Sequence, residues 1–337
     1  MAGERPTMVH VAEVAGVSVP TVSKVLNGRA DVSEATRSRV LKAVSATGYL
    51  PRLNASSERS GIIDLLIESV ASPWALEILR GAEAEAAHNG SAVAVSATMR
   101  PDFSIKRWLA SVAARRSDGV IFVLNRPDHE ELDALRELQA GVVLLDPVGE
   151  SEPELATVGA TNWNGALEAT EYLIGLGHTR IGFIGGPQAL RCSLDRYEGY
   201  VAALRRHQLD LDPSLVVWEE FRSEGGSKGA DALFAVPERP TAIFASSDQQ
   251  AAGVFHAARL QGLSIPRDLS VVGFDDTILG EYMSPRLTTV RQPLDDMARE
   301  AVRLLFERRS ARTDAPRIEL STSLVVRDSA APPAARR

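Results

Sequence analysis

Six residues near the ends of short apolar runs carry side chains that suit a polyhydroxylated ligand. They are Trp74, Asp146, Arg196, Phe221, Asp248 and Asp275. Arginine presents a rigid fork of donors to paired hydroxyl groups, and aspartate accepts hydrogen bonds from such groups. An aromatic ring can stack on the apolar face of a pyranose. The set therefore indicates a sugar-binding cleft. The alternatives are turn caps or structural ion pairs for the charged residues and core packing for the aromatic ones.

The other reactive residue types form no catalytic or metal-binding pattern. The turn at Gly185-Gly186-Pro187 lacks the Lys-Ser/Thr pair of a phosphate loop, and Asp275-Asp276 has no third ligand at metal spacing. The six histidines are scattered, and Cys192 lies in no nucleophile motif, so we expect a small buried thiol there. The sequence predicts neither an enzyme nor a need for a cofactor or metal.

Alternating strands and helices would bring the six residues together. Predicted strands cover 62–67, 92–96, 119–124, 142–145, 181–184, 216–218, 242–244, 270–272, 287–290 and 318–326, and predicted helices cover 74–88, 105–114, 128–139, 163–176, 196–207, 226–234, 249–261 and 294–308. This alternation is typical of parallel βαβ units. Because the rhythm runs twice, we predict two doubly wound parallel α/β lobes, with the ligand outside the carboxyl ends of the strands.

The first fifty residues follow a different pattern, that of short helices. Val11, Ala12 and Ala15 form one apolar stripe. Gly16 permits a left-handed turn, and Ser18 and Pro20 suit the start of a second helix. Val22, Val25 and Leu26 give that helix its own buried face. This is the layout of a helix-turn-helix, whose second helix enters the DNA major groove, although an ordinary corner between two helices has the same pattern.

A third helix and the charge distribution favour DNA binding. The segment that starts at Ser33 predicts a helix with Val40, Leu41 and Val44 on its buried face. Residues 1–60 carry eight Lys/Arg and five Asp/Glu, whereas the remaining residues carry 29 and 39 in a chain of net charge −7. A basic head on an acidic body directs polyanions to the head.

Three runs in this region carry a family signature: VAEVAGVSVPTVSKVLNG (11–28), VSEATR (32–37) and GYLP (48–51). They closely resemble the headpiece of LacI-family transcriptional regulators, and the resemblance extends over residues 7–328. It implies a headpiece at 1–50, a linker at 51–61 and a sugar-binding body at 62–328 that is similar to periplasmic binding proteins. The first lobe would comprise 62–160 and 291–320, and the second 161–290 and 321–328. We expect the Ala/Pro-rich tail, 329–337, to be disordered.

The resemblance also implies which residues meet DNA. Val19, Pro20 and Lys24 occupy the positions that family members use for base edges. Lysine can donate to guanine O6 and N7, whereas valine and proline offer only apolar contact, so we expect sparse hydrogen-bonded readout. Residues suited to phosphate oxygens, or alternatively to capping, are Thr7, Ser18, Thr21, Ser23 and Asn27.

In the body, the resemblance implies that Arg196 and Asp248 match the most widely used effector contacts of the family. It also implies a homodimer on a palindromic operator, because one headpiece reads only a half-site. Helices 74–88 and 249–261 are the implied dimer faces.

The linker departs from the family pattern, Tyr-x-Pro-Asn-x-x-Ala-x-x-Leu, whose leucine wedges into the minor groove. Glu58 stands where that leucine would be. A carboxylate would not enter an electronegative groove. Either Leu53 takes the role through a shift in register or the linker does not wedge, and we favour the second alternative.

Two further classes of protein share parts of this pattern. A sugar-binding transport receptor would share the body, but it needs a signal peptide and has no use for residues 7–50. An enzyme needs a convergent catalytic set. The lack of an apolar run of 18 residues, a single cysteine and an N-terminus without an apolar core predict a cytoplasmic protein with no membrane partner. The favoured interpretation is a repressor controlled by a small sugar.

Overall fold

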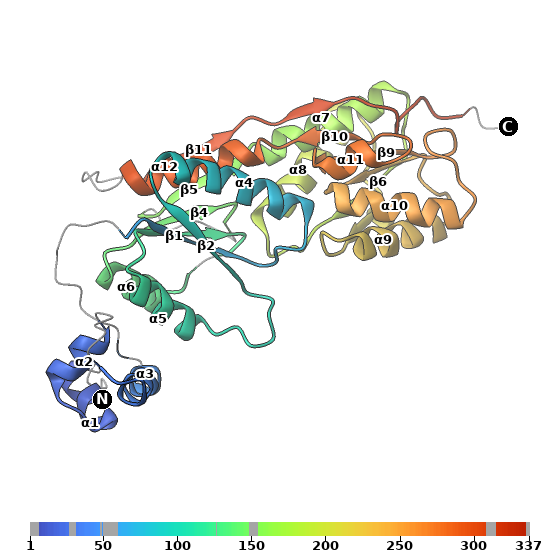
Figure 1. Ribbon diagram of the computed structural model, residues 1–337. Coiled ribbons are helices and arrows are strands. Elements are labelled where there is room, and N and C mark those ends of the chain that lie inside the picture. The colour runs from blue at the N-terminus through green and yellow to red at the C-terminus, as the bar shows by residue number, and fades with distance from the viewer. Residues whose placement is uncertain are drawn as a thin grey trace.

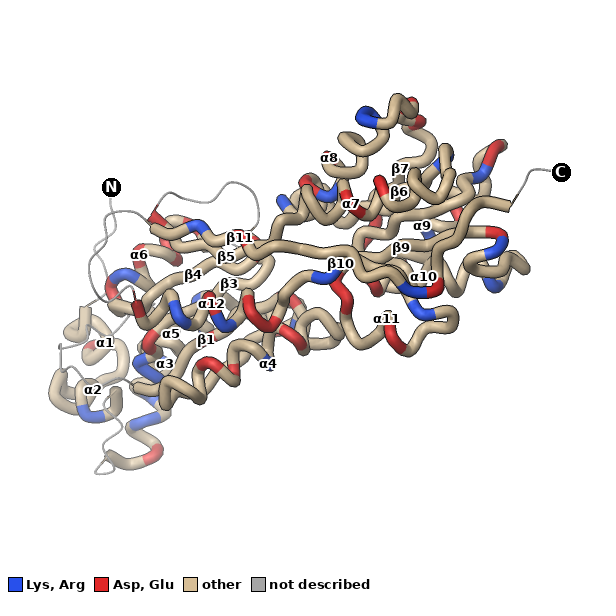
Figure 2. The backbone as a smooth tube through the Cα atoms, turned by 90° about the horizontal axis from the view of Figure 1, so that it is seen from above, with Lys and Arg blue, Asp and Glu red and all other residues tan. Residues whose placement is uncertain are grey.

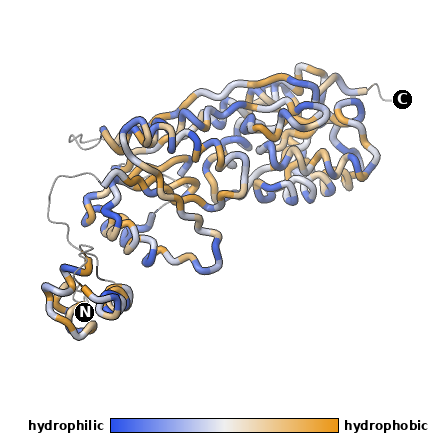
Figure 3. The backbone as a smooth tube through the Cα atoms, viewed as in Figure 1, coloured by the Kyte–Doolittle hydropathy of each residue, from blue (hydrophilic) through white to orange (hydrophobic). Residues whose placement is uncertain are grey.

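The computed structural model describes residues 7–26, 32–47, 49, 60–125, 127–147, 154–307 and 315–334 (Figure 1). An N-terminal group of helices is followed by two α/β lobes. Strands rich in apolar residues form the interior of each lobe, and charged residues lie mainly on the helices that cover them (Figures 2 and 3).

The headpiece contains helices α1 (Met8–Ala15), α2 (Val19–Leu26) and α3 (Glu34–Thr47). Thr7 caps α1, and Gly16 ends it in the left-handed conformation with φ 61°. Val22 and Val25 of α2 are buried, as expected. Leu41 is 51% exposed, so the prediction that it is buried was wrong. The buried face of α3 runs through positions 40, 43 and 44, and residue 41 lies about 100° away around the helix.

The first lobe is built on a sheet whose described strands have the order β11-β5-β4-β3-β1-β2, all paired in parallel. These strands are β1 (Ile62–Ile67), β2 (Ala92–Ala97), β3 (Gly119–Val123), β4 (Gly141–Leu145), β5 (Ala156–Ala160) and β11 (Arg317–Leu320). Helices α4 (Pro73–His88) and α12 (Leu294–Glu307) cover one face, and α5 (Ile105–Arg115) and α6 (His129–Glu137) cover the other (Figure 1).

The second lobe repeats this plan with the strand order β12-β10-β9-β8-β6-β7. Its strands are β6 (Ile181–Gly185), β7 (Val216–Trp218), β8 (Ala242–Ala245), β9 (Ser270–Asp275), β10 (Thr288–Arg291) and the antiparallel edge strand β12 (Ser323–Val325). Helices α7 (Asn162–Gly175) and α8 (Arg191–Arg206) cover one face, and α9 (Ser223–Ala235) and α10 (Asp248–Leu260) cover the other. A 3-10 turn (Pro213–Leu215) precedes β7, and α11 (Ile278–Tyr282) follows β9.

The chain passes between the two sheets where β5 leads into α7, where β10 leads into α12, and where β11 leads into β12. In Figure 2 the chain can be followed from β11, beside β5 in the first lobe, toward the second lobe, where β10 lies beside β9. Two of these crossings are tied together, because the Thr322 amide donates to Thr161 Oγ1 at 2.9 Å and Thr322 Oγ1 donates to the Thr161 carbonyl at 3.1 Å.

Three local predictions were wrong or incomplete. The predicted strand 318–326 is two strands, β11 and β12, which lie in different sheets. Strand β5 and helix α11 were not predicted, because both are short and β5, with the sequence ATVGA, is composed of small residues.

The expectation of a disordered tail is wrong for residues 329–331. Ser329 is fully buried, where its hydroxyl donates to the Val271 carbonyl at 2.6 Å and accepts from the Thr288 amide at 2.8 Å. The Ala331 amide donates to Ser270 Oγ at 3.0 Å. These polar contacts hold the segment against the second lobe even though its composition is that of a flexible tail.

In the described part of the chain, no single helix is long and apolar enough to cross a membrane. The bent pair α1 and α2 passes a test of length and composition together, but this pair is the helix-turn-helix.

Candidate functional site

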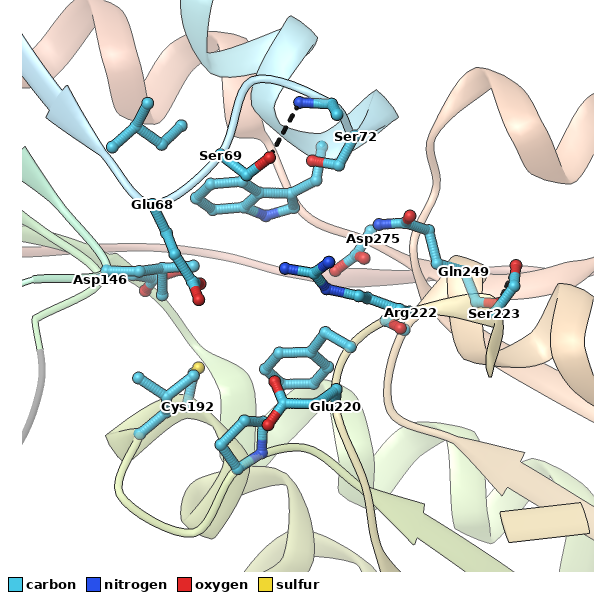
Figure 4. Close-up of a pocket in the computed structure, with 18 of the residues that line it drawn as sticks. Glu68, Ser69, Ser72, Asp146, Cys192, Glu220, Arg222, Ser223, Gln249 and Asp275 are labelled. Carbon is cyan, nitrogen blue, oxygen red and sulfur yellow. Dashed lines mark hydrogen bonds between the residues drawn. The ribbon is translucent and has the colours of Figure 1, made fainter. Parts of the chain in front are cut away.

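A cavity of about 560 Å³ lies between the two lobes. Glu68 and Asp146 directly follow β1 and β4, and Asp275 is the last residue of β9, so all three reach the cavity at the carboxyl ends of parallel strands. In Figure 4, Glu68 and Asp146 of the first lobe lie on one side of the cavity. Asp275, Glu220 and Arg222 of the second lobe lie around the rest of it. Five of the six predicted ligand residues line the cavity: Trp74, Asp146, Arg196, Phe221 and Asp275.

Arg196 is 3% exposed and is held from several sides. Its Nε donates to Asn162 Oδ1 at 2.8 Å, and its Nη1 donates to the Ser246 carbonyl at 2.5 Å. Its guanidinium lies 3.9 Å from the centroid of the Phe274 ring and 3.7 Å from Asp275 Oδ1. Much of its donor capacity therefore serves to fix the side chain, which presents a positioned positive charge to the cavity.

Two buried carboxyl groups accompany Arg196. Burial raises the pKa of Asp146 to about 6 and the pKa of Asp275 to about 7, and the Arg196 charge partly opposes both shifts. Asp275 Oδ1 also accepts from Gln292 Nε2 at 2.7 Å. Both residues have positive φ, 48° and 116° respectively, so each strand ends in a backbone conformation that L residues rarely adopt. Strained backbone and perturbed carboxyl groups in a cleft are typical of a binding site.

The aromatic residues lie on opposite lobes. Trp74 is in the first turn of α4, which begins at the N-cap Ser72. Phe221 follows β7, and its ring packs against Gly186, where a Cβ atom would lie 2.1 Å from the ring. Both are half-buried and line the cavity. A ring from each lobe could hold the apolar faces of one ligand.

Asp248 does not line the cavity, which contradicts the geometry expected for it. It is fully buried, with Oδ2 accepting from the Thr277 amide at 2.7 Å and from Thr277 Oγ1 at 3.0 Å, while Oδ1 accepts from Thr289 Oγ1 at 2.6 Å. Burial and the neighbouring Asp275 raise its pKa. Asp248 begins α10 with its side chain turned toward the sheet, so its role in this structure is to join three segments of the second lobe.

Sequence reasoning missed several cavity residues. Ser247 and Gln249 flank Asp248 and line the cavity in its place. Arg222 extends from the loop after β7 toward the first lobe, where Glu68 and Asp146 lie (Figure 4). Its Nη2 donates to Met99 Sδ at 2.8 Å, which is a contact between the lobes. The missed residues also follow strands, and that position was the signal that could have found them.

Cys192 is buried beside the cavity, as expected, and burial raises the pKa of its thiol to about 12. A thiol with this pKa is not a nucleophile at neutral pH. No group of His, Cys, Asp and Glu among the described residues could hold a metal ion.

The second candidate site is the surface of α2. Pro20 and Lys24 are exposed, and Val19, Thr21 and Ser23 are partly exposed, while Val22 and Val25 point into the headpiece core. Residues near the start of this helix hold each other in place, since Ser18 Oγ and Thr21 Oγ1 are 2.8 Å apart. Thr7 Oγ1 accepts from the His10 amide at 3.3 Å, so capping is one established role for Thr7. Asn27 and Glu58 lie outside the described residues.

A helix-turn-helix ahead of a two-lobed body with a central cavity defines a class of protein, the ligand-responsive DNA-binding regulators. Comparison with known proteins agrees with this class. Residues 7–52 match the model for bacterial regulatory proteins of the lacI family, and residues 170–330 match that for a periplasmic binding protein-like domain.

The transcriptional repressor CytR of Escherichia coli is 37% identical over 306 residues, which is 89% of each chain. The structure of the regulator CelR in complex with cellobiose is similar with a TM-score of 0.74 and 32% identity, covering 96% of this chain and 100% of that one. The lac repressor dimer bound to operator has a TM-score of 0.71 and 26% identity, covering 97% and 100%. The chain belongs to the LacI family of DNA-binding transcriptional regulators, which are not enzymes.

Proposed function

We propose that this protein is a repressor whose affinity for an operator is controlled by a small sugar in the cavity between the lobes. The observation that carries the proposal is that both lobes contribute to one cavity that contains a fixed guanidinium, two buried carboxyl groups and two aromatic rings. A ligand that touches both lobes changes the free-energy difference between their relative orientations.

The chemistry of the lining favours a neutral carbohydrate. Carboxyl groups outnumber guanidinium groups there, and the Arg196 guanidinium is already paired with Asp275. Hydroxyl groups can donate to Asp146 and Asp275 and accept from Arg196. A cavity of about 560 Å³ is in the size range of small-ligand sites. The similarity to a cellobiose-bound regulator supports a mono- or disaccharide, with Trp74, Asp146, Arg196, Phe221 and Asp275 as contacts. Asp248 would support the site from behind rather than contact the sugar.

At the headpiece, we assign base contact to Val19, Pro20 and Lys24 and backbone contact to Thr7, Ser18, Thr21, Ser23 and Asn27. The exposure of Pro20 and Lys24 on one side of α2, opposite its buried valines, supports this assignment. Lys24 is the base-reading residue with charged donors and should contribute most to direct readout.

The proposed domain division is a headpiece at 1–50, a linker at 51–61 and a two-lobed body. Because the chain crosses between the lobes three times, each lobe is built from separate segments of the chain. The protein would act as a homodimer on a palindromic duplex, as one headpiece reads only a half-site. The lac repressor dimer bound to operator supports this arrangement by analogy. Sugar binding would alter the relative position of the lobes and hence the distance between headpieces. A coupling of about 1–3 kcal/mol would change DNA affinity roughly 5–150-fold.

The test begins with selection of duplexes from a random pool by the full-length protein, followed by a thermal-shift screen of neutral mono- and disaccharides. We expect the selected sequence to be palindromic. The logarithm of the binding constant for this duplex should fall linearly with the logarithm of the salt concentration. We also expect a sugar that raises the unfolding temperature and alters DNA affinity. Selection that enriches no sequence would contradict the regulatory function itself.

A further inference from the structure

The carboxylate of Asp118 binds the chain at the point where it enters the body from the linker. Ser60 and Gly61 are the first described residues after residue 49. The Ser60 amide donates to Asp118 Oδ1 at 3.3 Å, and the Gly61 amide donates to Asp118 Oδ2 at 3.0 Å. Both oxygens of one carboxylate therefore accept from two consecutive amides. Hydrogen bonds to a charged acceptor are stronger than those between neutral groups.

The sheet itself does not require this contact. Pairing of β1 with β3 starts at Ile63 and Gly119, so Ser60 and Gly61 precede that ladder, and on the other side of β1 the Gly61 carbonyl accepts from the Ala92 amide at 2.7 Å. Gly61 has φ 70°, a left-handed conformation that turns the chain just before β1 begins. The carboxylate of Asp118 thus fixes two consecutive amides at a bend that immediately precedes β1.

Asp118 is itself firmly held. Its amide donates to the Ile62 carbonyl at 2.7 Å, and its carbonyl accepts from the Gly141 amide at 3.3 Å. The next residue, Gly119, lies under Leu305 of α12, where a Cβ atom would approach Leu305 Cδ2 to 2.8 Å. The backbone of Asp118 is therefore held between neighbouring strands, next to α12.

Helix α12 also connects the start of β3, next to Asp118, with the cavity. It begins at Leu294, two residues after Gln292, whose Nε2 donates to Asp275 in the cavity at 2.7 Å. The same helix reaches Leu305 next to Gly119 and Gly141. Helix α12 thus links the Asp275 side of the cavity to the sheet next to Asp118.

We propose that Asp118 is a positioning residue that makes the linker leave the first lobe in a fixed direction, so that the two headpieces of a dimer are held at a defined spacing. The inference rests on the proposed function, because it needs a dimer that reads two half-sites. It adds a residue that contacts neither DNA nor sugar and acts through the backbone of Ser60 and Gly61.

The test compares the full-length wild type with Asp118→Ala and Asp118→Asn on the duplex selected by the wild type. A second duplex carries two extra base pairs between the half-sites, which rotates one half-site by about a fifth of a turn. We expect the insertion to weaken wild-type binding about tenfold or more, and to weaken binding of Asp118→Ala by less than about threefold. Asparagine retains one acceptor oxygen, so Asp118→Asn should give an intermediate ratio.

The matched control is Asp133→Asn, which makes the same chemical change as Asp118→Asn. The side chain of Asp133 lies on α6 and is 60% exposed. This control variant should behave as the wild type does. Amide hydrogen exchange on the same proteins provides a readout without DNA. The peptide that contains Ser60 and Gly61 should exchange faster in both Asp118 variants and not in the control, while the peptides of β3 and β4 keep their wild-type rates.

The outcomes separate the two proposals. If no duplex is selected by the wild type, the regulatory function fails and this inference fails with it. If the wild type discriminates between the two spacings and Asp118→Ala discriminates equally, the function stands and the role of Asp118 is refuted. Faster exchange throughout β3 and β4 would also refute it, because the residue would then only stabilise the sheet.

Discussion

Arg196 shows how a cavity residue can be fixed before any ligand arrives. Its Nε and Nη1 bind the Asn162 side chain and the Ser246 carbonyl, and its guanidinium stacks on Phe274. Asn162 lies directly after the first crossing and Asp275 contacts Gln292 directly after the second. The charged centre of the cavity is thus joined to the segments about which the lobes would move.

At the DNA-facing surface, Lys24→Ala should weaken binding to the selected duplex by about 1–3 kcal/mol and relax the preference at one base pair. The reason is that lysine is the one proposed base-reading side chain that can donate to guanine. Repeating the selection with the variant measures the preference at each position. An unchanged profile would mean that the reading helix is misplaced.

The cavity carboxyl groups predict a dependence of stability on pH. Asp275 has a pKa of about 7 when folded and an ordinary value of 3.8, so the folded state binds its proton more tightly. Its favourable contribution is complete below about pH 3.8 and is lost as the pH rises through 7. Asp275→Asn removes this titration. Its unfolding free energy relative to the wild type should therefore increase between pH 5 and pH 8, as measured by urea denaturation. A difference that does not vary with pH would show that Asp275 does not titrate in this range.

At the scale of elements, the α2 core offers a matched pair of substitutions. Val22 is fully buried and Val14, on α1, is 52% exposed. Val22→Ala should destabilise the headpiece by about 2 kcal/mol, because two methyl groups leave a small core, while Val14→Ala should have little effect. Circular dichroism of the full-length proteins on heating would follow loss of the headpiece helices. Equal effects of the two changes would contradict the helical phase assigned to this region.

Most helices and strands could be predicted from the sequence, whereas some strand pairings and part of the cavity lining could not. Apolar runs and amphipathic segments predicted nearly all strands and helices, since local periodicity determines them. The division of 318–326 into β11 and β12 depends on pairing with β5 in one sheet and β10 in the other, which is not local information. In the cavity, Asp275 was recognisable as a charged residue at the end of a strand, and Arg196 as a charged residue in the helix that follows the Gly-Gly-Pro turn, although α8 begins at Arg191 rather than at the predicted residue 196. Asp248 was wrongly placed in the cavity, because a shift of one residue at a helix start turns a side chain by about 100°.

At the scale of the whole molecule, we expect a ligand between the lobes to change the affinity of the headpiece for DNA. The arrangement makes this possible because the cavity is formed by both lobes, while the linker enters the first lobe alone at Ser60 and Gly61. In the proposed dimer, a ligand would act on DNA binding through the relative position of the lobes.

The most direct measurement is the dissociation constant for the selected duplex, with and without a saturating sugar identified by thermal shift, for the wild type and for Arg196→Ala. We predict that the sugar changes the wild-type constant roughly 5–150-fold. The variant should bind the duplex as the wild type does without sugar and should show no response. A sugar that binds the wild type while leaving its DNA affinity unchanged would contradict the account.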